Sequence, residues 1–205
     1  MSTEQITSTS TATFATSPQM NAVSIFVAVV LGSSLIEFNE LLFPPKLNSL
    51  AFWGILPVYY FGLNAWFGVM AWGKYTPFLD KSLTRMWILF TLLAWASLLA
   101  LMYFTSRLPG SLSGYMWCLV VLFIFQWLGT SYRHRDTGLP EPLRLTIQFG
   151  SLTLIAAIAY SLWVLVFPPV PDIANWVFVF IAFAILVGYR VLLRSTHTWR
   201  PEEKQ

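Results

Sequence analysis

The chain has 205 residues and a strongly apolar composition. Hydrophobic residues make up 57% of it, aromatic residues 17% and charged residues only 10%, whereas soluble domains are about 25% charged. This composition excludes an ordinary soluble domain and indicates an integral membrane protein. The net charge is +3, but the basic residues are distributed between apolar segments, so we expect the lipid bilayer as partner and no nucleic acid.

The first twenty residues, MSTEQITSTSTATFATSPQM, are rich in serine and threonine and contain no lysine or arginine. Such a polar segment has too little apolar surface to fold, so residues 1–20 are predicted to form a disordered tail. The segment also lacks the basic start and the small-residue cleavage site of a signal peptide. The apolar segment that follows is therefore predicted to be a retained helix.

Six apolar segments follow the tail, and each is long enough to cross a membrane. A hydrocarbon core about 30 Å thick needs roughly 20 apolar residues in a helix. Short turns separate the segments, so the sequence predicts an all-α polytopic membrane protein of three antiparallel helical hairpins, ending in a polar tail over residues 195–205. The six predicted spans are about 21–42, 50–72, 85–105, 114–132, 145–167 and 174–194.

Glu37 and Glu40 are acidic residues near the end of the first predicted span. On a continuous helix they fall within about 60° of each other and of Ser33. A charge at the bilayer centre costs about 2.5–3.5 kcal/mol, which makes intramembrane acids functional candidates. The pair is predicted to hold a proton, coordinate a cation or neutralise a basic partner. The alternative is an interfacial role, with Lys46 and Arg107 as salt-bridge partners.

The second predicted span contains Pro57, which removes one backbone hydrogen bond and is expected to loosen or kink the helix. Asn64 follows two turns later, on the same broad face as Tyr60. Its amide makes it a candidate to line a path together with Ser33 and the two acids.

The last two spans contain small and basic residues for which we predict structural roles. Arg190 and Arg194 lie at the end of the sixth span, where long basic side chains reach the membrane interface. Small residues recur every three or four positions along the fifth span and predict a helix-packing face. These residues are Thr146, Gly150, Thr153, Ala157 and Ser161.

The basic residues gather on one side of the predicted spans, while the opposite side holds only Lys46 and Arg107. This asymmetry predicts a cell-membrane protein with both termini in the cytoplasm. It also accounts for the basic cluster in the loop at 133–144, for which an anionic lipid headgroup is the alternative explanation. The residues on the basic side are Lys74, Lys81, Arg85, Arg133, Arg135, Arg144, Arg190, Arg194, Arg200 and Lys204.

Sequence motifs for catalysis are missing. No histidine or internal lysine lies within a predicted span, and there is no CxxC, GxSxG, HExxH or glycine-rich phosphate loop. We therefore expect no enzyme activity, no cofactor and no metal. The leading hypothesis is a small transporter or channel-like protein for a proton, a cation or a small solute. The alternative is a non-catalytic scaffold or accessory subunit that binds another membrane protein, and a homo-oligomer is also compatible with the small size.

Overall fold

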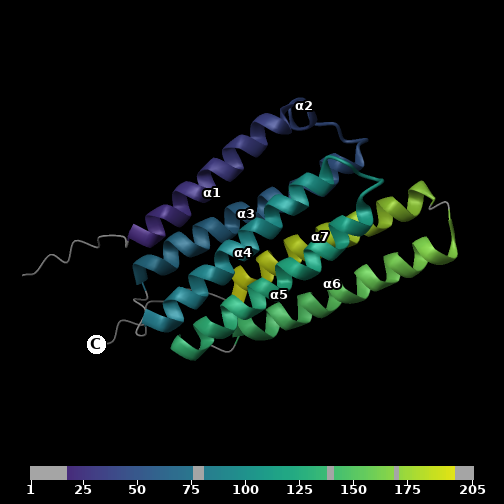
Figure 1. The fold of residues 1–205 in the computed structure, drawn as a ribbon. Helices are drawn as coiled ribbons and strands as arrows, with labels where there is room; N and C mark the ends of the chain where they lie inside the picture. Colours follow the sequence, from purple (N-terminus) through teal and green to yellow (C-terminus); the bar gives the residue numbers. More distant parts are fainter. Residues whose placement is uncertain (1–17, 76–80, 138–140, 169–170, 197–205) are drawn as a thin grey trace, which may run out of the picture.

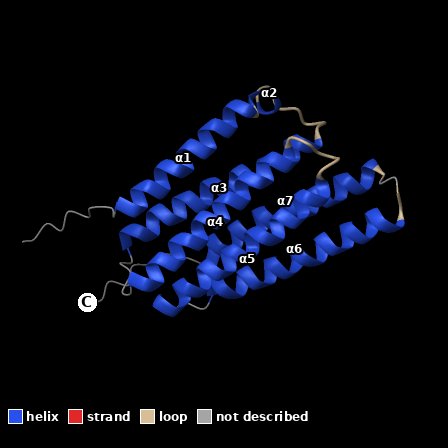
Figure 2. Cartoon of the chain, viewed as in Figure 1, coloured by secondary structure: helices blue, strands red, loops and turns tan. Residues whose placement is uncertain are grey.

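The computed structural model describes residues 18–75, 81–137, 141–168 and 171–196. All regular structure in these ranges is helical, as Figures 1 and 2 show. The predicted tails fall outside the described residues, except that the first helix already starts at Pro18 and the last ends at Thr196. The helices are α1 (Pro18–Glu37), α2 (Asn39–Leu42), α3 (Leu50–Tyr75), α4 (Lys81–Thr105), α5 (Leu112–Thr137), α6 (Glu141–Val166) and α7 (Asp172–Thr196).

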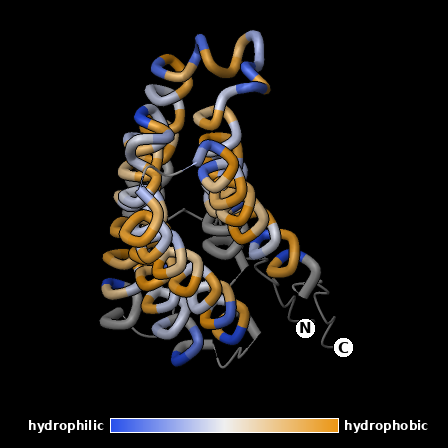
Figure 3. The backbone as a smooth tube through the Cα atoms, turned by 90° about the vertical axis from the view of Figure 1, so that its right-hand side faces the viewer, coloured by the Kyte–Doolittle hydropathy of each residue, from blue (hydrophilic) through white to orange (hydrophobic). Residues whose placement is uncertain are grey.

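Five of the described helices, α3 to α7, are long and apolar enough to cross a membrane. Helix α1 adds a shorter apolar stretch, Ile25–Glu37, among its described residues. The hydrophobic residues cover most of the length of the bundle, and the hydrophilic residues lie mainly near its ends (Figure 3). The all-helical class is confirmed, and these helices indicate a multi-pass membrane protein.

Helices α3 to α7 form a ring in chain order. Each helix packs against the next, and α7 returns to pack against α3. Helix α1 lies outside this ring, against α3 and α4. Figure 1 shows that α1 begins and α7 ends at the same end of the bundle.

Large side chains and interhelical hydrogen bonds fill the ring. Phe61, Phe123 and Tyr189 pack their rings together from α3, α5 and α7. Across the ring, the Tyr115 hydroxyl of α5 donates a 2.9 Å hydrogen bond to the Gly54 carbonyl of α3. This bond satisfies a hydroxyl that has no access to water.

The predicted packing face of α6 is confirmed. Thr146, Thr153 and Ala157 are fully buried. A Cβ atom added at Gly150 would lie 3.5 Å from Phe123, and the Trp117 indole donates a hydrogen bond to the Ser161 hydroxyl. The small side chains let α5 approach α6 closely, as small residues do in membrane bundles.

The prediction of one continuous helix over 21–42 is wrong at Phe38. Helix α1 ends at Glu37, and the four-residue helix α2 starts at Asn39. The Phe38 side chain is buried in the core, and the backbone leaves the helix where this ring turns inward. The chain then becomes extended at Phe43, because a residue before proline avoids the α conformation.

The other helices match the predicted spans but continue beyond them at the end where the basic residues lie. Helix α5 runs to Thr137, so the segment 133–137 is helical and the prediction of a loop there is wrong. Hydropathy marks only the apolar part of a helix, and polar residues can continue the same backbone hydrogen bonding.

Gly114 in α5 provides a test of the packing between α4 and α5. A Cβ atom there would lie only 2.6 Å from the ring of Phe104, so Gly114→Ala forces that ring to move. We expect a loss of about 1–3 kcal/mol in the free energy of unfolding, measured as a lower Tm in detergent. Gly129→Ala in the same helix is the control, because its Cβ would meet only Phe90 at 3.6 Å. An unchanged Tm for Gly114→Ala would contradict the observed packing.

Candidate functional site

The two acids of the predicted site lie on separate helices. Glu37 is the last residue of α1 and Glu40 lies in α2, and both side chains are exposed. Within the described part of the chain, neither carboxylate forms an ion pair with Lys46 or Arg107. Arg107 instead lies over the ring of Tyr103, with its guanidinium carbon 4.2 Å from the ring centre.

Glu37 lies near the end of the bundle that carries the short turns. Helices α1 and α3 are antiparallel, and Ser34 contacts Tyr59 while Leu31 contacts Gly62. Three residues after Ser34, Glu37 therefore lies at the height of about residue 56 of α3. Gly54 lies two residues from this height toward the start of α3. It packs against Thr105, the last residue of α4. At 1.5 Å per residue, Glu37 is only about 3 Å inside the end of α4.

Ser34, and not the predicted Ser33, makes the polar contact between α1 and the bundle. Ser33 is exposed, and its hydroxyl bonds only to carbonyls of its own helix. Ser34 is buried and accepts a 2.9 Å hydrogen bond from the Tyr59 hydroxyl of α3. Glu37 is close enough to Tyr59 for an electrostatic interaction, so the structure brings Ser34, Tyr59 and Glu37 together.

Asn64 lies away from this group. It is half-buried, and its amide donates to the Tyr60 carbonyl of its own helix. By the register of α1 and α3 it is level with about Val29, roughly 12 Å along the axis from Glu37. At 100° per residue it faces the flank of α3 on which Trp53 packs against α7.

On that flank the bundle contains a buried cation, Arg190 of α7. Its side chain is only 8% exposed. Its guanidinium carbon lies 3.9 Å above the ring centre of Phe61 and 5.4 Å from that of Tyr189. Its Nε and Nη2 atoms are buried and have no hydrogen-bond partner.

Arg190 lies level with the middle of two neighbouring helices. Phe61, which it covers, packs against Phe123 in the middle of α5. Gly62, the next residue, faces Trp95 in the middle of the α4 span. The guanidinium group of Arg190 therefore lies about midway between the two ends of α4 and of α5.

The prediction that Arg190 reaches the membrane interface is wrong. Its place near the end of the apolar stretch of α7 suggested an exposed side chain, and Arg194 one turn later is indeed exposed. Helix α7 is shifted along the bundle axis, so Arg190 lies level with the middle of α4 and α5. In the sequence, the only indication of a buried Arg190 was its position four residues before the end of an apolar span.

No family model, curated protein or solved structure matches this chain. The assignment of a site therefore depends on the geometry of these residues. Among the residues that the structure describes, no three His, Cys, Asp or Glu side chains are grouped to hold a metal ion.

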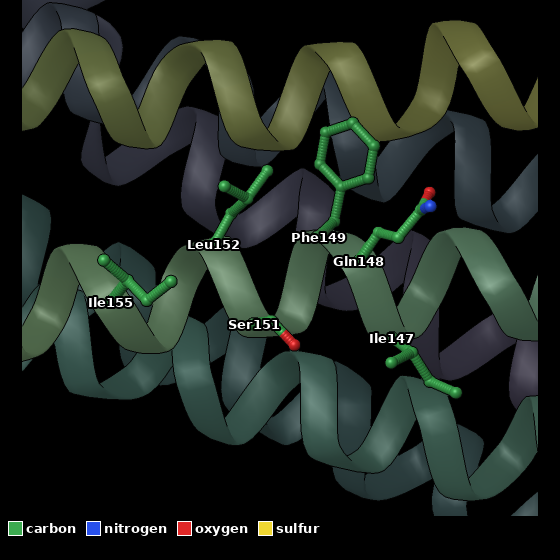
Figure 4. Close-up of a pocket in the computed structure, with 6 residues that line it drawn as sticks. All are labelled: Ile147, Gln148, Phe149, Ser151, Leu152 and Ile155. Atoms are coloured by element: carbon green, nitrogen blue, oxygen red, sulfur yellow. The ribbon is translucent and has the colours of Figure 1, made fainter.

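A surface hollow of about 480 Å³ lies along α6. The six labelled residues in Figure 4, from Ile147 to Ile155, all come from this one helix. Most of them are apolar, and Phe149 points toward α7, where it packs against Tyr189. Because all six residues come from one helix and four of them are apolar, the hollow offers few groups that could bind a polar solute.

Paired variants on α1 test the contact of Ser34. Ser34→Ala removes the partner of the buried Tyr59 hydroxyl and should cost about 1–3 kcal/mol, measured as a lower Tm in detergent. Ser33→Ala should stay within about 0.5 kcal/mol of the original protein, because Ser33 is exposed and bonds only within α1. Equal effects of the two variants would mean that Ser34 does not attach α1 to the bundle.

Proposed function

We propose that this chain is a small membrane transporter for a small solute, with its central site at the contact of α3 and α7. The observation that carries this proposal is Arg190, a buried charge with two unpartnered nitrogens. Ionisable groups inside membrane bundles are costly and occur mainly at sites of ion or substrate passage. The proposal involves no covalent chemistry and no cofactor.

The backbone of α3 beside this site supports movement. Pro57 is buried within α3, one turn before Phe61. Proline removes a backbone hydrogen bond and weakens a helix at that turn. A carrier must open its site to each side of the membrane in turn, and Pro57 provides a place where α3 bends against α7. Asn64 and Tyr60 share this flank and are proposed to line the path.

The acidic residues Glu37 and Glu40 are proposed to act at the outer entrance. Both are exposed near the bundle end and belong to helices outside the ring. There they would raise the local concentration of protons or cations, with Ser33 beside them. A cation passing through the ring itself would meet the positive charge of Arg190, which favours a neutral or anionic solute on that route.

A second candidate function is that of an accessory subunit bound to another membrane protein. It is favoured by the two exposed carboxylates, which form no ion pair with the described basic residues. Helix α1 also presents Val29 and Ile36 outward, with 62% and 80% of their side chains exposed. A partner helix with apolar and basic residues would match this surface.

For the topology we propose six spans with both termini in the cytoplasm. Helix α1 has 20 residues, which corresponds to about 30 Å at 1.5 Å per residue. It runs antiparallel to α3, as a crossing helix would. A sixth crossing by α1 also places the N-terminal segment on the side of the basic residues.

Cysteine labelling tests the sixth crossing. On a Cys118→Ser background, Ser8→Cys should resist a membrane-impermeant maleimide in intact cells and react after permeabilisation, because α1 would return the N-terminal segment to the cytoplasm. Lys46→Cys should react in intact cells and Arg135→Cys should not, which controls for the two sides. Labelling of Ser8→Cys in intact cells would show that α1 does not cross.

Flux into liposomes tests the transport proposal. Purified protein should move at least one of potassium, protons, glycerol, urea or acetate about tenfold faster than protein-free liposomes, followed with ion dyes and light scattering. If the probe that moves is acetate, glycerol or urea, Arg190→Met should abolish this flux, because it removes the proposed binding group of the central site; a flux of potassium or protons should not be slowed, because the positive charge of Arg190 disfavours a cation. Arg194→Met is the matched control and should keep it.

The Glu37→Gln/Glu40→Gln double variant separates the two parts of the proposal. A severalfold slower flux of protons or potassium would support the outer entrance, because the acids attract cations and repel an anion such as acetate. An unchanged flux of these cations would remove the acids from the path. If none of the five probes moves faster than in protein-free liposomes, the transport proposal fails. The accessory-subunit function would then be tested by cross-linking at Ile36 in native membranes.

A further inference from the structure

The free donors of Arg190 lie together on one edge of its guanidinium group. The two buried nitrogens without a hydrogen-bond partner are Nε and Nη2. In arginine these atoms are neighbours, and their N–H bonds point in the same direction. This pair of donors matches the two oxygens of a carboxylate or of a phosphate group, which it binds through two parallel hydrogen bonds.

Aromatic rings hold this edge in a defined orientation. The ring of Phe61 covers one face of the guanidinium at 3.9 Å, and Tyr189 lies 5.4 Å away. Tyr189 is itself held by a 2.9 Å hydrogen bond to Thr146 and by ring contacts to Phe123 and Phe149. Because the face is occupied, the edge is the direction left for binding. Protein atoms cover this edge, since both nitrogens are buried, so α3 and α7 would have to part beside it before a ligand could reach it.

A structural role does not account for this arrangement. A buried charge without hydrogen-bond partners costs several kcal/mol, and an apolar residue of similar size is often more stable in its place. Cation–π contact returns only about 2 kcal/mol when the pair is desolvated. An anion on the free edge would satisfy both donors and cancel the charge.

The surroundings of Arg190 restrict the anion to a single charge. Arg85, Arg144 and Arg194 are exposed, and Arg190 is the one buried basic side chain among the residues that the structure describes. A monocarboxylate would make the site neutral, whereas a phosphate dianion would leave a buried negative charge. The aromatic side chains of Phe61 and Tyr189 also favour a ligand with an apolar body.

We propose that the Nε and Nη2 edge of Arg190 binds the carboxylate of a small monocarboxylate with an apolar body. This inference rests on the proposed function, because it names the class of solute at the same central site. The carboxylate comes either from a water-soluble acid or from a fatty acid of the bilayer. In both cases the two oxygens accept hydrogen bonds from Arg190 between α3 and α7.

Ligand-dependent thermal stability of the purified full chain in detergent tests this binding. Benzoate represents a soluble aromatic monocarboxylate, laurate a fatty acid, benzamide a neutral analogue of benzoate, and inorganic phosphate, at a pH well above its second pKa, a dianion. Benzoate or laurate should raise the Tm in a concentration-dependent way, while benzamide and phosphate should not. The stronger of the two carboxylates identifies the source. Equal stabilisation by benzamide, or stabilisation by phosphate alone, would overturn the proposal.

Variants of Arg190 show whether the effect arises at this residue. Arg190→Met should lose the response to the carboxylate and, without ligand, should have a Tm at least as high as the original protein, because an unpartnered buried charge is gone. Arg190→Lys keeps the positive charge but lacks the two parallel N–H donors of the guanidinium edge. Its affinity for the carboxylate should therefore fall at least tenfold. Arg194→Met should respond like the original protein. A full response in Arg190→Met, or in Arg190→Lys if the Met variant does not fold, would place the ligand elsewhere.

The binding and flux experiments can fail separately. Carboxylate binding that depends on Arg190, without flux of any probe, would keep the site and overturn transport. Flux of a neutral probe without carboxylate binding would keep transport and overturn the monocarboxylate as the ligand class.

Discussion

The structure depends on the need to satisfy polar groups where there is no water. Inside a bundle that faces hydrocarbon, an unpaired donor or acceptor costs far more than at a soluble surface. Hydroxyl groups meet this constraint by joining helices: Tyr59 of α3 to Ser34 of α1, Tyr115 of α5 to Gly54 of α3, and Tyr160 of α6 to Asn175 of α7. Among the described residues, Arg190 and Trp66 are the exceptions, since neither the free edge of Arg190 nor the Trp66 Nε1 atom has a hydrogen-bond partner.

The helices could be predicted because they depend on local properties of the chain. Apolar length and the short turns between the apolar segments are visible in the sequence, and they locate α3 to α7 within a few residues. The break at Phe38 was not visible, because nothing in the composition of residues 34–40 distinguishes a continuous helix from one interrupted where a ring turns into the core. The helical ends beyond the apolar stretches were missed for a related reason, since hydropathy measures the membrane environment and not backbone hydrogen bonding.

The site was harder to predict because it depends on how the helices rotate and slide against each other. A rotation of one residue, or 100°, decides whether Ser33 or Ser34 faces α3. The depth of a charge likewise depends on the neighbours and not on its position within its own span. Glu37 lies inside an apolar run but near the end of the bundle, whereas Arg190 lies near the end of an apolar run but level with the middle of α4 and α5. Pairwise contacts such as that of Phe61 with Tyr189 are needed to establish this shift.

The buried charge also links stability to occupancy. With its edge free, Arg190 destabilises the contact between α3 and α7, and the ring of Phe61 offsets only part of this cost. An anion on that edge would remove the cost, so the occupied bundle would be the more stable and more closed form. Release of the anion would leave the charge of Arg190 unpaired again, about one turn from Pro57, which removes a backbone hydrogen bond of α3. A solute that binds two conformations of the α3 and α7 contact with different affinities would shift their populations, which is what a carrier needs to change conformation with its solute.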